Sequence, residues 1–258
     1  MINFKFLIDN KEKFRNEYLA AKPFPYLILD GVCDQEKLLK LYSEIPELEN
    51  KSRDYFFANN KFEKSNYKVL GSLFEELNND LQSQEMNEFL SFISSEDIFV
   101  DPKNHGGGLH QGKKNSFLDM HADFNYHPIN KFWFRNLNLL LYLNKDWKPE
   151  YGGQLKLEDA RTGKKGLIDV PFNRLVIQQT RTWTLHGYDL TNFPEGVFRT
   201  SIATYAYTNH IMHIEKPRTT DWKPKENDSI LKKMAAKYYD SAIKIKNKLF
   251  GIGTAKNQ

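Results

Sequence analysis

Two histidines and one aspartate have the residue types and the spacing needed to bind a metal ion. His121 and Asp123 lie two positions apart, and His186 follows far along the chain. On a β-strand, residues i and i+2 project from the same face, so His121 and Asp123 can reach one ion. Two imidazoles and one carboxylate on one side of iron(II) leave its other side open to further ligands. The three residues therefore predict a catalytic iron(II) site, with His186 supplied by a neighbouring strand.

Arg199 lies thirteen residues after His186 and adds a group that can bind an organic acid. Its guanidinium is planar and permanently charged, and it matches the geometry of a carboxylate. A metal with open positions and a carboxylate anchor are what an oxygenase would need to use a 2-oxo acid. The competing interpretation is a buried His186 bonded to the main chain, together with an unrelated His-x-Asp pair at the surface.

The remaining histidines are weaker candidates for metal ligands. His210 and His213 lie three positions apart at the end of an expected strand. This spacing points their side chains to opposite faces of the strand. We interpret both as surface residues.

The composition limits the class of protein and its compartment. The chain has 258 residues, of which 40% are apolar, so a sizeable core can form. Cys33 is the single cysteine, so no intrachain disulfide is possible, and a reducing, cytoplasmic compartment fits best. The first apolar run is too short for a secretory signal. No segment approaches the ~20 apolar residues of a membrane span.

The net charge of +4 is distributed unevenly. Residues 216–258 hold eleven Lys or Arg against four Asp or Glu, a local charge of +7, which leaves about −3 for the rest of the chain. A basic tail can contact nucleic acid or an anionic surface. We interpret this tail as the solvated face of a terminal helix and expect no specific nucleic-acid partner.

The elements that must position the site begin with an N-terminal support region, residues 1–97, packed on the core. Apolar spacing predicts helices over 10–21, 34–45 and 71–94. A short apolar run at 26–29 predicts a buried strand.

Two further regions complete what we expect to be a single structural domain. Residues 98–214 contain many short apolar runs separated by turn signals, which favours a sandwich, barrel or jelly roll as the catalytic core. Residues 215–258 form a basic segment with an amphipathic helix from Asp228 to Phe250. We expect its apolar stripe to pack against the N-terminal helices. The stripe comprises Leu231, Met234, Tyr238, Ala242, Ile245 and Leu249.

The stretch from Gly108 to Thr208 resembles the iron(II)- and 2-oxoglutarate-dependent dioxygenases of the prolyl-hydroxylase type. His121-Ala-Asp123 matches the family's H-x-D motif, and His186 matches its distal ligand. Arg199 matches the basic residue that binds the C5 carboxylate of 2-oxoglutarate. Further similarity lies in the strand and turn at 135–147, the G-G-x-L turn at 152–155, the segment Pro171-Phe-Asn-Arg-Leu175 and the opening strand at 26–31.

The resemblance implies the fold, the cofactors and the reaction. The fold would be α+β with a mainly β core, a double-stranded β-helix of the jelly-roll or cupin type, flanked by N-terminal helices and a C-terminal helix. The cofactors would be Fe(II), 2-oxoglutarate and dioxygen, and ascorbate is compatible with them. Iron and dioxygen would decarboxylate 2-oxoglutarate to succinate and CO2 while an unactivated C–H bond is hydroxylated.

The resemblance also suggests further residues for the cosubstrate. Tyr142 occupies the position of a family tyrosine that helps to hold the tail of 2-oxoglutarate. Ser201 lies two positions after Arg199 on the same strand face, and Asn138 shares the strand face of Tyr142. Ordinary strand packing is the alternative for Tyr142 and Ser201. Gln111 stands where prolyl hydroxylases often carry a cosubstrate tyrosine, so the substrate class stays open.

Three classes of substrate fit: a peptidyl proline, a free amino acid and a saccharide unit. Asp123 is present, whereas related halogenases lack this carboxylate, which favours hydroxylation. A catalytically silent binding module on the same jelly-roll scaffold is the alternative function, because a fold does not fix a function. A zinc hydrolase with the same ligands is a third alternative, in which Arg199 would lack a purpose. The sequence does not determine the oligomeric state.

Overall fold

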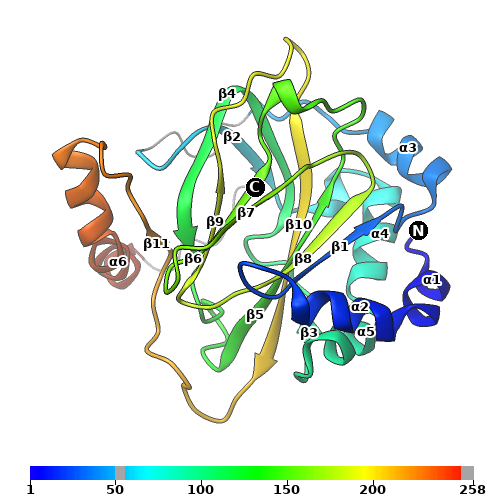
Figure 1. Cartoon of the computed structure of the whole chain (residues 1–258), viewed down its shortest axis with the longest axis horizontal. Helices are drawn as coiled ribbons and strands as arrows, with labels where there is room; N and C mark the ends of the chain where they lie inside the picture. The colour runs from blue at the N-terminus through cyan, green and yellow to red at the C-terminus, as the bar shows by residue number, and fades with distance from the viewer. Residues whose placement is uncertain (50–55, 251–258) are drawn as a thin grey trace.

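The computed structural model describes residues 1–49 and 56–250 (Figure 1). The last residues of the expected C-terminal segment, 251–258, lie outside the described part. The helices are α1 (Phe4–Asp9), α2 (Lys11–Ala20), α3 (Gln35–Ser43), α4 (Ser72–Leu81), α5 (Gln84–Ser94) and α6 (Ile230–Phe250), with short 3-10 turns at Tyr67–Val69 and Pro149–Tyr151.

The strands form one curled sheet in which every pairing between strands is antiparallel. They are β1 (Tyr26–Asp30), β2 (Ala58–Lys64), β3 (Phe99–Val100), β4 (Gly108–Ala122), β5 (Trp133–Tyr142), β6 (Leu155–Asp159), β7 (Lys165–Ile168), β8 (Arg174–Gln179), β9 (Thr184–Tyr188), β10 (Arg199–Asn209) and β11 (Asp221–Trp222). The main order is β1-β8-β5-β10-β4-β9-β6-β7, with β2 and β11 on β4 and β3 on β10.

Strand β4 connects the two layers of this sheet. Its first part, through Gly112, pairs with β10, whereas its last part, from Leu118 to His121, pairs with β9. The fifteen-residue strand therefore carries the chain from one layer into the other. This bend brings the β9 side of the sheet opposite the β10 side and encloses the space between them.

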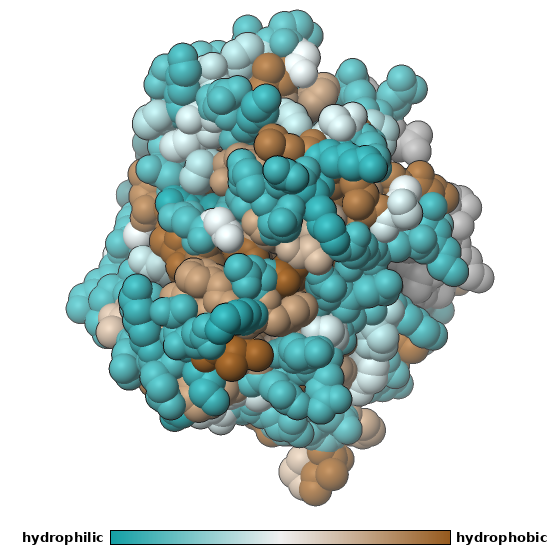
Figure 2. Space-filling view, turned by 90° about the vertical axis from the view of Figure 1, so that its right-hand side faces the viewer, coloured by the Kyte–Doolittle hydropathy of each residue, from teal (hydrophilic) through white to brown (hydrophobic). Residues whose placement is uncertain are grey.

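Helices α1 to α5 cover the outer face of the layer that contains β1, β8, β5 and β10 (Figure 1). The main core fills the space between these helices and the sheet, and Leu38, Leu77 and Leu137 are fully buried in it. The outer surface on this side is mostly hydrophilic, with separate apolar patches (Figure 2). Burial of one helical face against the sheet is the main stabilising contribution expected for such a layer.

The structure differs from the helices predicted for the N-terminal region in two places. The predicted helix over 71–94 is two helices, because Ser83 begins a new one by accepting a hydrogen bond from the main-chain N–H of Met86. A cap of this kind competes with continuation of the preceding helix. Helix α1 and strand β2 were not predicted, since the short α1 and the polar sequence of β2 lack a clear apolar period.

Helix α6 lies on the side of the sheet opposite α1 to α5 (Figure 1). The prediction that its apolar stripe packs on the N-terminal helices is therefore wrong. Leu231 is 69% exposed and Met234 51% exposed. The face that does pack carries Tyr239, whose ring lies 6.0 Å from those of Phe57 and Trp222. Small and aromatic side chains fit this surface, whereas the larger aliphatic residues of the stripe point away. Among the described residues, no helix is long and apolar enough to cross a membrane.

Candidate iron and cosubstrate site

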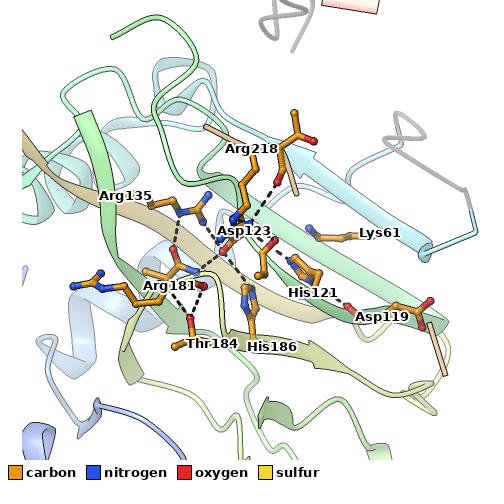
Figure 3. Close-up of polar contacts among 12 residues, drawn as sticks. Lys61, Asp119, His121, Asp123, Arg135, Arg181, Thr184, His186 and Arg218 are labelled. Carbon is orange, nitrogen blue, oxygen red and sulfur yellow. Dashed lines mark hydrogen bonds and ion pairs between the residues drawn. The ribbon is translucent and has the colours of Figure 1, made fainter. Parts of the chain in front are cut away.

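The pairing of β4 with β9 brings the predicted metal ligands together. His121 near the end of β4 is the direct register partner of His186 on β9, and Asp123 follows β4 immediately. Their ligand atoms all lie within 4.8 Å of one another. The Nε2 atom of His121 lies 3.6 Å from Oδ1 of Asp123, and Nε2 of His186 lies 3.6 Å from Oδ2 (Figure 3).

Gly187 permits this close approach of the two strands. A Cβ atom at this position would lie 2.6 Å from the main-chain oxygen of Leu118 on β4. Any side chain would therefore push β9 away from β4 and separate His186 from His121.

Both imidazoles are prepared to act as ligands through Nε2. The Nδ1 atom of His121 lies 2.8 Å from the main-chain oxygen of Asp119 and must donate to it, so Nε2 is the ring atom that can bind a metal. Burial lowers the pKa of His186 to about 3, against the opposing attraction of Asp123, so its ring is neutral. The ring of Trp222 lies 4.7 Å from that of His121 and limits its movement.

Asp123 is held as a carboxylate by two buried neighbours. Arg135 Nη2 lies 3.0 Å from Oδ2 (Figure 3). Asn138 Nδ2 donates to the same oxygen at 2.7 Å. Asn138 in turn accepts a hydrogen bond from Nε of Arg135 at 2.9 Å. Burial by itself would raise the pKa of the Asp123 carboxyl, but the adjacent Arg135 guanidinium holds this pKa well below its usual value.

Arg218 reaches the same residue from the segment that precedes β11. Its Nη1 atom donates to the main-chain oxygens of Ala122 and Asp123 (Figure 3). The main chain at Asp123 is therefore fixed as well as its side chain. Two imidazoles and one fixed carboxylate form a donor set that fits iron(II).

The three candidate ligands line a pocket of about 740 Å³. Arg199 on β10 lines the same pocket and is only 7% exposed. Its Nε atom donates to the main-chain oxygen of Gly153 at 2.7 Å, and its guanidinium lies 4.0 Å from the ring of Tyr188 and 5.2 Å from that of Tyr142. A guanidinium oriented in this way between aromatic rings is suited to bind a carboxylate.

The structure places the other predicted cosubstrate residues in the same pocket. Ser201 is the register partner of Tyr142, and both side chains are buried. Burial raises the pKa of the Tyr142 hydroxyl, and nearby Arg199 opposes this shift, so the hydroxyl stays protonated. Asn138 also lines the pocket, but its amide is used by Asp123 and Arg135, which places it at the metal ligand rather than at the cosubstrate tail. The amide of Gln111 is bonded to the main chain of Pro46 and Leu48.

Several residues of the site were not found by sequence reasoning. Tyr188 lies two positions after His186, so strand alternation could have placed it in the pocket. The sequence also contained a feature that could have identified Arg135, because a charged residue within an apolar strand needs a buried partner. No sequence feature identified Arg218 or Trp222 as site residues, since only the fold brings their segment beside β4. Phe124, which directly follows Asp123, also lines the pocket.

Comparisons with known proteins agree with this geometry. Residues 107–207 match the sequence model of the 2OG-Fe(II) oxygenase superfamily. No curated protein sequence matches the chain. The fold is similar to a prolyl 4-hydroxylase structure from Phytophthora capsici, with a TM-score of 0.54 and 15% identity over 81% of this chain and 66% of that chain.

Two further solved structures show the same fold. A prolyl 4-hydroxylase from Pseudomonas putida has a TM-score of 0.55 and 14% identity over 78% of this chain and 100% of that chain. The non-heme alpha-ketoglutarate-dependent epimerase SnoN from nogalamycin biosynthesis has a TM-score of 0.53 and 11% identity over 85% of this chain and 88% of that chain. The fold class predicted from the sequence, a double-stranded β-helix with helices at both ends, is confirmed.

A curled antiparallel sheet around a His-Asp-His cluster is the arrangement expected of a non-haem iron oxygenase. Residues 107–207 match the 2OG-Fe(II) oxygenase superfamily, and the fold is similar to that of two prolyl 4-hydroxylase structures. The resemblance stated from the sequence is therefore confirmed. The same holds for the cofactors, because enzymes of this superfamily use Fe(II), 2-oxoglutarate and dioxygen.

Proposed function

We propose that this protein is a hydroxylase with His121, Asp123 and His186 as its iron ligands. The observation that carries the proposal is the cluster of three ligand atoms within 4.8 Å on the wall of a pocket that also contains Arg199. Iron held there would activate dioxygen with 2-oxoglutarate as the co-reductant, so that one oxygen atom would enter an unactivated C–H bond and the other would enter succinate, with release of CO2.

The side chains around the triad bind and orient the reactants. Arg199 binds the C5 carboxylate of 2-oxoglutarate, and the hydroxyls of Tyr142 and Ser201 donate hydrogen bonds to it. Gly153 fixes the direction of the Arg199 guanidinium through its main-chain oxygen. Arg135 and Asn138 keep Asp123 ionised and oriented.

The pocket favours a polar substrate. Beyond the triad it is lined by charged and amide side chains from β2, α4 and the loop before β4, with Phe124 and Tyr205 among the aromatic ones. A volume of about 740 Å³ accommodates the cosubstrate together with a small polar molecule or a residue of a peptide. We therefore propose a peptidyl proline, an amino acid or another small polar molecule as the substrate.

Succinate formation tests the proposal. Purified protein supplied with Fe(II), 2-oxoglutarate and dioxygen is expected to form succinate slowly alone and faster with a substrate from a panel of these classes. His186→Ala leaves two protein ligands and is expected to abolish iron binding and succinate formation. His210→Ala is the matched control, because His210 lies outside the pocket beside Thr208. A wild-type protein that forms no succinate with any substrate would instead support a silent binding module. A His186→Ala variant with wild-type activity would show that His186 is not an iron ligand.

A further inference from the structure

Helix α6 carries an apolar stripe that no described residue covers. The exposed fractions of the side chains in this stripe run from 51% at Met234 to 69% at Leu231. Their spacing of three, four and seven positions places them on one helical face. This outward stripe comprises Leu231, Met234, Tyr238, Ile245 and Leu249.

The opposite face of α6 is fixed to the protein. Asp240 accepts hydrogen bonds from the main-chain N–H and the hydroxyl of Thr219, at 2.8 and 2.9 Å. Lys232 pairs with Asp119 at 2.5 Å, and Tyr239 packs against Trp222. These contacts set the rotation of the helix about its axis, so the outward stripe is left exposed.

The charges beside the outward stripe are positive. Residues 230–249 contain six lysines and one acidic residue, Asp240, which already pairs with Lys244 at 2.6 Å. Successive residues of an α-helix are rotated by about 100° around its axis. This rotation places a row of lysines on one flank of the stripe and Lys246 on the other flank. The row comprises Lys233, Lys237, Lys244 and Lys248.

We propose that α6 docks this protein on the surface of an anionic lipid bilayer. An amphipathic helix with basic flanks lies in the interface with its apolar face among the acyl chains and its lysines at the headgroups. Each lysine adds attraction to an anionic surface. This binding site is separate from the oxygenase chemistry, so its test does not depend on the substrate.

Charge complementarity favours a lipid surface over the other possible occupants. A second copy docked through the same face would bring two rows of lysines together around the symmetry axis, and like charges oppose such contact. Nucleic acid would satisfy the lysines but would leave the outward stripe in water.

Vesicle co-sedimentation of the full chain tests the proposal. The protein is expected to bind vesicles made of equal parts of phosphatidylserine and phosphatidylcholine, with an affinity that falls as salt is raised. Little binding is expected to phosphatidylcholine alone. A Leu231→Ser, Met234→Ser, Tyr238→Ser variant is expected to bind at least ~10-fold more weakly, because it loses apolar surface. A Lys237→Gln, Lys246→Gln, Lys248→Gln variant is expected to bind these vesicles about 100-fold more weakly than the wild type.

Matched variants on other surfaces control for exposure and charge. They are Ile8→Ser with Leu19→Ser and Val69→Ser for the stripe, and Lys145→Gln with Lys148→Gln and Lys164→Gln for the lysines. All replaced side chains are exposed, so every variant is expected to keep the wild-type melting temperature, which a thermal scan verifies.

Three results would overturn the proposal. The first is a wild-type protein that does not bind phosphatidylserine vesicles at low salt. The second is binding that the stripe variant leaves unchanged. The third is a dimer, detected by light scattering, that dissociates in the stripe variant, because a second copy would then cover α6.

Discussion

Asp123 is the candidate ligand with the most support from its neighbours. Arg135 and Asn138 both contact its Oδ2 atom, and Arg218 bonds its main-chain oxygen. A buried carboxylate without such partners would take up a proton and lose its affinity for a metal. These contacts therefore prepare the site before the metal arrives, as supporting residues do in metal sites generally.

Arg199→Ala is expected to weaken the binding of 2-oxoglutarate by ~30-fold or more. Losing one partner of a buried, hydrogen-bonded charge pair costs ~2–5 kcal/mol of binding free energy. Each ~1.4 kcal/mol corresponds to a tenfold change in the dissociation constant. Iron affinity should change much less, since Arg199 is absent from the triad. Calorimetric titration of each ligand measures both effects.

Arg199→Lys serves as the control for charge. Lysine keeps the positive charge but lacks the planar fork, so its affinity for 2-oxoglutarate should fall between those of the wild type and Arg199→Ala. Equal affinities in all three proteins would show that the C5 carboxylate binds elsewhere.

At the scale of elements, the turn before β6 positions the cosubstrate anchor. Gly153 has a φ of +75°, and a Cβ atom there would lie 3.0 Å from Cδ and 3.2 Å from Nε of Arg199. Gly153→Ala is therefore expected to strain the turn by ~1–3 kcal/mol and also to displace the guanidinium. The dissociation constant for 2-oxoglutarate should rise, as measured by the same titration.

Gly163→Ala is the control that distinguishes backbone strain in a turn from direct contact between a new Cβ atom and Arg199. Gly163 has a similar φ of +69°, but nothing lies within 4 Å of its Cβ position. This variant should lose stability while keeping the wild-type affinity for 2-oxoglutarate. If both variants bound the cosubstrate equally well, the contact between Gly153 and Arg199 would have no role in binding.

The loop between β3 and β4 depends on one buried carboxylate. Asp101 accepts the main-chain N–H groups of Lys103 at 2.9 Å and His105 at 2.6 Å, and its Oδ2 lies 3.4 Å from Nε2 of His127. Burial by itself would raise the pKa of Asp101, but the hydrogen bonds from His127 and these two N–H groups lower it.

Asp101→Asn is expected to cost ~1–3 kcal/mol of unfolding free energy near neutral pH. The folded-state pKa of Asp101 lies below the unfolded value of ~3.9, so its contribution is fully present above that pH and is lost as pH falls through the lower value. Denaturant titrations from pH 6 to 2 measure the slope. The wild type should lose stability more steeply than the variant below about pH 4; parallel curves would contradict this role.

At the scale of the whole molecule, the curled sheet has two unlike sides. Helices α1 to α5 bury one side in the main core, whereas α6 lies on the other side and contacts the sheet through β11 and Phe57 (Figure 1). The site lies between the two layers, and Trp222 lies between α6 and His121. The packing of α6 thus contributes to the wall of the pocket.

Two adjacent tyrosines distinguish the packed face of α6 from the exposed one. Tyr239→Ala is expected to lower the free energy of unfolding by ~1–3 kcal/mol, because its half-buried ring leaves a gap beside Phe57 and Trp222. Tyr238→Ala should change it by less than ~0.5 kcal/mol, since Tyr238 is 54% exposed. Chemical denaturation measures both free energies. A larger loss of stability for Tyr238→Ala than for Tyr239→Ala would show that α6 packs through the opposite face.

Much of the fold was predictable because its signals are local. Strand alternation, the glycine turn at 152–153 and the N-cap Asp34 each act over a few residues, and β1, β6 and α3 follow closely from them. The types and spacing of His121, Asp123, His186 and Arg199 also suffice to suggest a metal and a carboxylate anchor. The polar strand β2 was not predicted, because it is its pairing with β4 that makes it a strand and not its own sequence pattern.

The sequence by itself indicated the resemblance to a family, the candidate ligands and the existence of an amphipathic C-terminal helix. Only the tertiary structure decided which groups support Asp123, since Arg135, Asn138 and Arg218 converge from separate segments. It also decided that the apolar stripe of α6 faces outward. A periodic pattern shows that a helix has two faces, but which face is buried depends on the surface that folding places beside it.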